Sequence, residues 1–282
     1  MDIFEALYRQ GACECGTVAA PSLAERMPRG QAERLCSIYS GVQTVIMAAF
    51  PYYAGNGGGN ISLYARGVDY HSVVKGRLEA ACKAAELDGV ALVDASPIPE
   101  AYAAALAGCG AVGLNGLLIT PDCGSLVFIG AILTGRDVVA EERSGTNTCD
   151  RCGRCAEACP TGALRVTEGN RAFNRELCLS YLTQKKGALT GRENRFIAQN
   201  GMVWGCDRCQ LSCPRNYGIS LTGIPEFLDK LVCNIPEEQL SGMPDEEFLR
   251  LFGDRAFAWR GLAPLKRNAE SILCYNKSKN NE

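Results

Sequence analysis

The residues with the clearest chemistry in this sequence are its cysteines. The 282-residue chain has 16 cysteines and a single histidine, His71. We expect a cytoplasmic protein, because the N-terminus lacks the basic start and apolar stretch of a secretory signal. Since the cytosol keeps thiols reduced, so many cysteines predict metal or redox sites rather than disulfides. One histidine argues against His-rich zinc and iron sites, which leaves iron–sulfur clusters or Cys₄ zinc.

Two runs of cysteine distinguish between these chemistries. The first, over residues 149–160, reads C-x₂-C-x₂-C-x₃-C-P and is the bacterial ferredoxin pattern in full. The second, over residues 206–214, repeats the end of that pattern without its first cysteine, for which Cys178 is the substitute. In two-cluster ferredoxins the fourth cysteine of a run binds the other cluster. This crossing predicts two 4Fe–4S clusters with these ligands: Cys149, Cys152, Cys155 and Cys213 for one, and Cys159, Cys178, Cys206 and Cys209 for the other.

A pair of Cys₄ zinc sites is the alternative interpretation of these runs. Zinc ribbons use two separate CxxC knuckles, which the longer run matches poorly, so the spacing favours iron–sulfur clusters. The other eight cysteines lack such spacing, and we expect most of them to be small buried side chains. The roles of four remain open: Cys13, Cys15, Cys109 and Cys123.

Composition and charge exclude several classes of protein. The chain is 47% hydrophobic and 21% charged, which permits a buried core. Its net charge of −2 gives no basic field for generic nucleic-acid binding. Apolar runs stay well short of the roughly 18 residues that span a bilayer, so we expect no membrane partner. The absence of a P-loop and of a strand–GxGxxG–helix motif gives no support to nucleotide chemistry.

The pattern of apolar residues predicts an α+β fold in the first half of the chain. Strands are expected at 42–50, 90–93, 117–120 and 126–134, and helices at 72–87 and 97–106, the second capped by Ser96. A polar stretch at 136–148 marks a domain boundary. We therefore predict a catalytic α+β domain at 1–140, a double-cluster domain at 141–218 and a helical tail at 219–282.

Two residues of the first domain could carry chemistry besides the cysteines. Asp94 follows the strand predicted at 90–93, where a shielded carboxyl group can have its pKa raised enough to donate a proton near neutrality. A turn or capping aspartate is the alternative. His71 opens the long predicted helix and could be a cap, a core histidine or a ligand. Two clusters form an electron-transfer path, and its acceptor is expected within 1–140.

Several segments together resemble the epoxyqueuosine reductases, which are cobalamin- and iron–sulfur-dependent enzymes of queuosine synthesis on tRNA. The matching segments are YARGVDYH at 64–71, VDASP at 93–97, GSLVFIG at 124–130, CLSYLT at 178–183 and GCDRCQ at 205–210. Cysteine runs occur in many ferredoxin-like proteins, whereas the first and fourth of these segments are more specific.

The resemblance implies a nitroreductase-like corrinoid-binding domain followed by a bacterial two-cluster ferredoxin-like domain and a short helical tail. Cobalamin is then expected between the corrinoid-binding domain and the clusters, which are fed by an external flavodoxin or ferredoxin. The resemblance makes Asp94 the catalytic proton donor for reductive opening of the epoxide. It assigns cofactor binding to these residues: Tyr64, Tyr70, His71, Ser125, Ser180 and Tyr181.

The sequence also departs from the family pattern. The usual GWIGKN reads GAVGLN at 110–115, and the Glu-Arg pair that follows the aspartate is Glu100-Ala101 here. We expect a short, divergent member without C-terminal helical repeats, and this weakens the expectation of tRNA as partner. Two alternatives stay open: a divergent paralogue that reduces a small molecule or a corrinoid, and a non-catalytic double-cluster electron-transfer protein.

Overall fold

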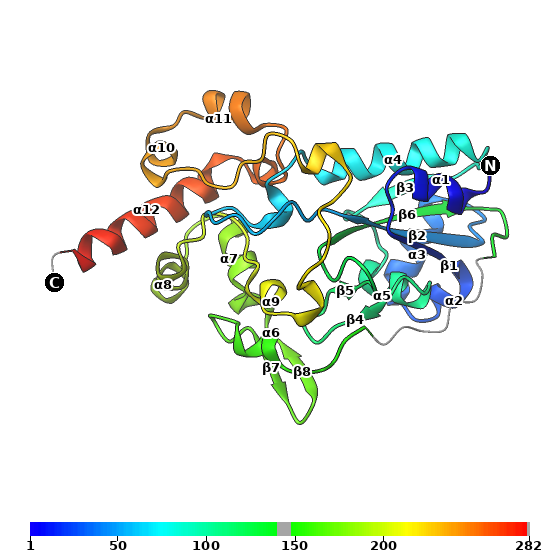
Figure 1. Cartoon of the computed structure of the whole chain (residues 1–282), viewed down its shortest axis with the longest axis horizontal. Helices are drawn as coiled ribbons and strands as arrows, with labels where there is room; N and C mark the ends of the chain where they lie inside the picture. The colour runs from blue at the N-terminus through cyan, green and yellow to red at the C-terminus, as the bar shows by residue number, and fades with distance from the viewer. Residues whose placement is uncertain (140–147, 281–282) are drawn as a thin grey trace. The chain divides into compact units, whose positions relative to one another are not determined.

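The computed structural model describes residues 1–139 and 148–280, and these fold into two compact units (Figure 1). Each unit is assembled from three separate segments. Unit 1 comprises Met1–Tyr53, Tyr70–Cys152 and Pro214–Ile224, and unit 2 comprises Ala54–Asp69, Gly153–Cys213 and Pro225–Glu282. The division predicted from the sequence, 1–140, 141–218 and 219–282, uses continuous segments and stays a prediction. Most of its first boundary, 136–148, lies outside the described residues.

Unit 1 is built on a four-stranded antiparallel sheet. The strands, in the order β1-β2-β6-β3, are Glu14–Ala19, Thr44–Pro51, Val127–Thr134 and Val90–Val93. Strand β2 is buried along nearly its whole length. A strand that is covered on both faces needs an unbroken apolar run, and this explains why the sequence of β2 does not alternate.

Helices cover both faces of this sheet (Figure 1). Helix α4, Tyr70–Ala84, packs on one face beside α1, Ile3–Arg9. A side chain at Gly130 of β6 would meet Leu78 of α4 at 2.7 Å, so the close approach of the helix requires glycine there. The opposite face carries the core shared with α5, Glu100–Leu106, and with α2, Ala20–Ala24, and α3, Arg29–Ile38.

The strands predicted at 42–50, 90–93 and 126–134 are confirmed as β2, β3 and β6, and the helix at 72–87 as α4. The strand at 117–120 shrinks to β5, Leu118–Ile119, which pairs with β4, Ala111–Val112. The predicted start of the helix at 97–106 is wrong, because α5 begins at Glu100 after the N-cap Pro99. Ser96 instead accepts a hydrogen bond from the Ile98 N–H at 3.2 Å and stabilises the preceding turn.

Unit 2 is mostly helical. Its elements are α6 Arg154–Glu157, the hairpin β7 Leu164–Thr167 and β8 Asn170–Phe173, α7 Leu179–Gln184, α8 Gly191–Asn200, α9 Arg208–Leu211, α10 Glu237–Gly242, α11 Asp245–Phe252 and α12 Leu262–Lys279. Helix α12 packs against α7, α8 and α10. A capping box between Thr190 and Glu193 begins α8. Trp204, Phe248 and Phe257 are fully buried in the core.

The two units together confirm the predicted α+β class. Among the described residues, no helix combines the length and apolar character needed to cross a bilayer.

Candidate functional site

Asp94 lies in a tight turn directly after β3. Its backbone has a positive φ of 58°, which aspartate tolerates better than most residues other than glycine. The Asp94 N–H donates to Oε1 of Glu100 at 2.7 Å. One residue on, the Ala95 N–H donates to the Val93 carbonyl at 2.7 Å, which tightens the turn. These contacts direct the Asp94 side chain away from the sheet and toward the start of α4.

Two side chains of α4 bind the Asp94 carboxylate. The Tyr70 hydroxyl donates to Oδ2 at 2.7 Å, and Nε2 of His71 lies 3.1 Å from the same oxygen. The contact with His71, followed by that with Tyr70, lowers the pKa of Asp94. The expectation of a raised pKa for Asp94 is therefore wrong, because these contacts outweigh the effect of burial. The side chain is 60% exposed and is held ionised by hydrogen bonds.

The raised pKa belongs instead to a neighbouring carboxyl group. Burial, and then the negative charge of Asp94, raise the pKa of Glu100 from 4.5 to about 7. Sequence reasoning noted Glu100 only as part of an altered dipeptide. A glutamate at the first position of a helix is normally interpreted as a favourable charge for the helix dipole, so its link to Asp94 is hidden in the sequence.

Aromatic side chains support the Tyr70 hydroxyl. The Tyr70 ring stacks on Phe128 of β6 with centroids 4.3 Å apart, and Phe128 contacts Tyr52 at 4.4 Å. On its other side, Tyr70 stacks on His71 at 4.0 Å. Stacking on both sides limits movement of the ring and fixes the direction of its hydroxyl. The structure thus brings together Asp94, Tyr70 and His71 of the predicted site residues.

Ser125 is placed in a second polar cluster of unit 1. Its N–H donates to Oδ1 of Asn216 at 2.8 Å, and Nδ2 of Asn216 donates to the Ser125 hydroxyl at 3.0 Å. The preceding Gly124 has φ of 55°, and any side chain there would collide with Asn216. Sequence reasoning missed Asn216, whose only signal is its place two residues after the Cys-Pro that ends the second run.

The second predicted set of cluster ligands lies wholly within unit 2. Cys206 is electrostatically coupled to Cys178 and Cys159, and Cys209 to Cys206 and Cys178. Cys209 is also coupled to Cys155, which the crossing pattern assigns to the other cluster. Burial first, with neighbouring negative groups, raises the pKa of Cys206 to about 11 and of Cys209 to about 12. Ligation by iron would relieve the repulsion between these negative groups, because the positive charge of the iron ions compensates the charge of the thiolates.

Cys159 has the surroundings of a cluster ligand. Its sulfur accepts the Leu164 N–H at 3.5 Å and contacts the Thr161 hydroxyl at 3.7 Å. Burial opposes ionisation of Cys159, but these hydrogen bonds outweigh it and lower its pKa. N–H···S bonds of this kind also tune the potential of iron–sulfur clusters. Cys149 and Cys152 belong to unit 1, and Cys155 and Cys213 to unit 2, so the first ligand set stays a prediction from the sequence.

Within residues 1–139 and 148–280, no three Cys, His, Asp or Glu side chains converge as a single metal ion requires. A cubane cluster spreads its four thiolates over several iron atoms, so it does not need that convergence. The choice of iron–sulfur clusters over zinc therefore rests on the spacing of the cysteines.

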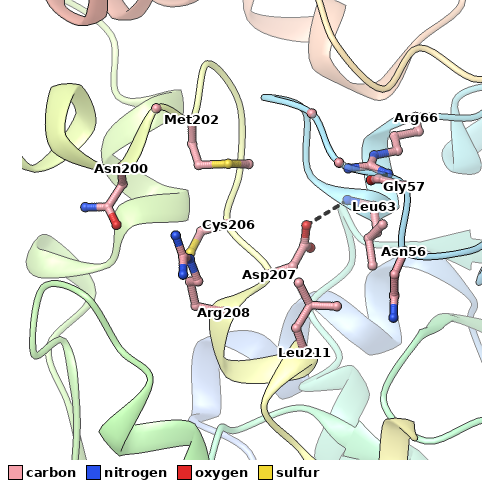
Figure 2. Close-up of a pocket in the computed structure, with 13 residues that line it drawn as sticks. Asn56, Gly57, Leu63, Arg66, Asn200, Met202, Cys206, Asp207, Arg208 and Leu211 are labelled. Atoms are coloured by element: carbon pink, nitrogen blue, oxygen red, sulfur yellow. Dashed lines mark hydrogen bonds between the residues drawn. The ribbon is translucent and has the colours of Figure 1, made fainter. Parts of the chain in front are cut away.

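A cavity of about 240 Å³ in unit 2 borders the cluster cysteine Cys206 (Figure 2). Beside it, the buried carboxylate of Asp207 accepts the Ser62 O–H at 2.5 Å and the Leu63 N–H at 2.9 Å. Arg66 forms part of the cavity wall and donates to the Ile61 carbonyl at 2.9 Å. These bonds tie the 56–66 segment to the loop that carries Cys206.

The remaining predicted residues of unit 2 have protein partners. Tyr64 accepts a hydrogen bond from Nε1 of Trp204 at 2.8 Å, and Ser180 accepts one from Gln184 at 3.3 Å. The ring of Tyr181 lies 4.6 Å from the Arg175 guanidinium.

Helix α7, which follows Cys178, is held at its C-terminal end by α12. Arg267 donates to the carbonyls of Leu182, Lys185 and Gly187. The adjacent Asn268 is fully buried and donates to the carbonyls of Thr183 and Val203, both at 2.8 Å. Cationic and amide donors satisfy the free carbonyls that every helix end presents. These contacts were not predicted from the sequence.

Five of the eight cysteines outside the clusters do not meet the expectation of full burial. Cys15, Cys82 and Cys109 are buried, whereas Cys36 and Cys274 are exposed and Cys13, Cys123 and Cys233 are intermediate. The thiols of Cys13 and Cys123 are hydrogen-bonded to each other, and that of Cys13 also donates to the Ala49 carbonyl at 3.4 Å.

Comparison with known proteins agrees with the cysteine pattern. Residues 148–216 match the family model described as "4Fe-4S double cluster binding domain", so the chain is a two-cluster iron–sulfur protein. Residues 33–95 match the model described as "Epoxyqueuosine reductase QueG, DUF1730".

Curated relatives extend the match. An epoxyqueuosine reductase of Gloeobacter violaceus is 35% identical over 254 residues, which cover 84% of this chain and 77% of the relative. That of Lactococcus garvieae is also 35% identical, over 76% of this chain and 61% of the relative. The chain belongs to the epoxyqueuosine reductase family. It spans 56 to 61% of the length of several curated relatives, including those of Lactococcus garvieae and Listeria monocytogenes.

Solved structures show the same fold over nearly the whole chain. The epoxyqueuosine reductase of Streptococcus thermophilus superposes with a TM-score of 0.80 and 25% identity, covering 99% of this chain and 81% of the other. A crystal structure of epoxyqueuosine reductase with a tRNA-Tyr epoxyqueuosine-modified stem loop has a TM-score of 0.76 and 25% identity, covering 98% and 80%.

Proposed function

We propose that this protein reduces epoxyqueuosine to queuosine in tRNA. The overall change adds two electrons and two protons to the epoxide, replaces its two C–O bonds by a carbon–carbon double bond, and releases the oxygen as water. The observation that carries this proposal is the Asp94–Tyr70–His71 cluster in a chain with an electron-transfer domain. Such a reaction needs both an electron supply and a proton donor at the reacting oxygen.

The role that we propose for Asp94 is delivery of a proton from Oδ2. Because its pKa is lowered, Asp94 is ionised at rest and must receive a proton before it can give one. Tyr70 and protonated His71 are the donors in contact with Oδ2. Arrival of a substrate that displaces these contacts and excludes water would raise the pKa of Asp94 and favour its protonation. A solved Bacillus subtilis epoxyqueuosine reductase has its catalytic aspartate loop swung out of the active site, which supports a mobile carboxylate.

We further propose that this chain binds cobalamin and that unit 1 has a nitroreductase-like fold. When bound, cobalamin supplies a low-potential cobalt centre that accepts electrons from the clusters and reacts with carbon. Tyr64, Ser125, Ser180 and Tyr181 are the residues that the family resemblance assigns to it. Their hydroxyl groups and aromatic faces suit a flat macrocycle with amide-bearing side chains. Tyr70 and His71 would both donate a proton to Asp94 and contact the cofactor.

The proposed partners are the epoxyqueuosine-modified tRNA and a flavodoxin- or ferredoxin-type donor. The relative solved with a modified stem loop supports the first. Segment 153–213, which carries most of the cluster cysteines, has a local excess of positive charge, with nine Lys and Arg against five Asp and Glu. Basic residues near a cluster steer acidic partners toward it.

The test is conversion of an epoxyqueuosine-bearing stem loop under anaerobic, reducing conditions with cobalamin, followed by mass spectrometry of the nucleosides. Replacement of Asp94 by Asn should lower turnover about 10²-fold while iron, sulfide and corrin content stay unchanged. Asp137→Asn, at an exposed position of unit 1, is the matched control. Equal turnover of the Asp94→Asn and wild-type proteins would refute the assignment of Asp94.

The same preparation separates the two alternatives. A paralogue with another substrate would bind corrin and leave the stem loop unchanged. A non-catalytic electron-transfer protein would contain iron and sulfide and show no corrin absorption after incubation with cobalamin.

A further inference from the structure

We propose that Glu100 is a positioning residue for Asp94, because its ionised carboxylate holds the turn that directs Asp94 toward Tyr70 and His71. This inference deepens the proposed function and rests on it. It assigns a role to a residue that makes no contact with the reacting atoms, and it predicts a pH dependence that differs from that of Asp94 itself.

The geometry begins with the backbone of Asp94. A φ of 58° is unfavourable for a residue with a side chain, so neighbouring contacts must hold it. The Glu100 carboxylate is one such contact, since its Oε1 accepts the Asp94 N–H at 2.7 Å. An N–H bonded to a charged oxygen forms a stronger hydrogen bond than one bonded to a neutral oxygen. Loss of this acceptor would leave the turn free to return to ordinary backbone conformations.

Glu100 is also firmly anchored. It begins α5, whose Ala103 and Ala104 are fully buried in the core beneath β2. The same Oε1 lies 3.4 Å from the Ser96 hydroxyl, which is bonded in turn to the Ile98 N–H. The carboxylate therefore contacts the turn at both Asp94 and Ser96. A movement of the Asp94 backbone away from α4 would break or stretch its bond to a helix that is packed in the core.

The charges around Glu100 determine the pH above which its carboxylate is ionised and binds the Asp94 N–H most strongly. Asp94, at the end of β3, opposes ionisation of Glu100, whereas His71 of α4 and the Asp94 N–H favour it. Burial is the largest influence and, with Asp94, raises the pKa of Glu100 to about 7. The carboxylate is thus fully ionised only above neutrality. Protonation below pH 7 removes the negative charge that binds the Asp94 N–H and loosens the turn.

Two substitutions distinguish a titrating acceptor at position 100 from a side chain with a purely structural role. Glutamine keeps an oxygen that can accept the Asp94 N–H but cannot titrate, whereas alanine removes the acceptor. Because protonated glutamate also keeps a neutral carbonyl oxygen, Glu100→Gln should hold the turn at every pH as wild type does below pH 7, and Glu100→Ala should loosen it further. Glu79→Gln is the matched control, because Glu79 is an exposed glutamate of α4.

The closing experiment combines two readouts on the full-length protein. The first is kcat for the epoxyqueuosine-bearing stem loop across the neutral range. Wild type and Glu79→Gln should lose turnover below pH 7 with the same acid limb. Glu100→Gln should lack that limb and stay, at every pH, near the turnover that wild type shows below pH 7, whereas Glu100→Ala should fall about 10-fold below wild type at high pH. An unchanged acid limb in Glu100→Gln, or full turnover in Glu100→Ala, would overturn the proposal.

The second readout does not depend on turnover. Hydrogen–deuterium exchange of the peptide containing Asp94 reports the bond from its N–H to Glu100. Protection at high pH should drop about 10-fold in Glu100→Ala and should be intermediate in Glu100→Gln. Equal protection in wild type and Glu100→Ala would refute the role of Glu100, whether or not the stem loop is converted. If the stem loop is not converted but this difference in protection is found, the proposed function fails while the contact with Glu100 stands.

Discussion

Replacement of Glu100 by Gln should make folding stability less dependent on pH. Burial and Asp94 raise the pKa of Glu100 from 4.5 to about 7, so the native protein binds this proton more tightly than the unfolded chain does. The resulting stability is fully present below the unfolded pKa of 4.5 and is lost as the pH rises through 7. The pKa difference corresponds to about 3 kcal/mol, of which about 2.5 kcal/mol is lost between pH 5 and pH 8.

The assay is urea unfolding of wild type and Glu100→Gln near pH 5 and near pH 8, under anaerobic conditions. The difference in unfolding free energy between the two proteins should shift by about 2.5 kcal/mol in favour of Gln at the higher pH. Glu79→Gln should show no such shift, because that carboxylate is exposed. A constant difference between wild type and Glu100→Gln would mean that Glu100 titrates at its ordinary pKa, which would refute the effect of burial and of Asp94 on it.

Two further substitutions test unit 2. Cys178→Ala should remove one cluster and spare the other, so the iron and sulfide content per chain should fall to about half. Retention of both clusters would refute the crossed ligand assignment. Asn268→Ala should destabilise the protein by about 2–3 kcal/mol, because it removes the amide donor from the carbonyls of Val203 and Thr183, both of which it contacts at 2.8 Å. Asn276→Ala, at an exposed position of the same helix, should change the unfolding free energy by less than about 0.5 kcal/mol, and an equal effect of both substitutions would contradict this reasoning.

The central elements of unit 1 could be predicted because burial on two faces leaves a strong sequence signal. Strands β2 and β6 are long apolar runs, and β3 is a short one between polar turns. Strand β1, Glu14–Ala19, was missed because its small and polar residues give no such pattern. Its strand conformation comes from pairing with β2 at the edge of the sheet, and this is information that a local sequence window does not contain.

The candidate site was predictable only in part. The position of Asp94 at a strand end and the resemblance of its segment identified the residue, and the cysteine spacing identified the iron–sulfur domain. The direction of the Asp94 pKa shift could not be predicted, because it depends first on an imidazole 23 positions away and then on a hydroxyl 24 positions away in the sequence. The same holds for Glu100, whose pKa follows from burial against the turn rather than from its own position in a helix.

The most direct test of the whole account is a single-turnover reaction of the cluster-loaded, cobalamin-supplemented protein with epoxyqueuosine-bearing tRNA stem loop. The nucleoside product should have lost one oxygen atom, and its amount should be proportional to the electrons supplied through the clusters. A fully reduced, corrin-containing protein that leaves the modified nucleoside unchanged would contradict it.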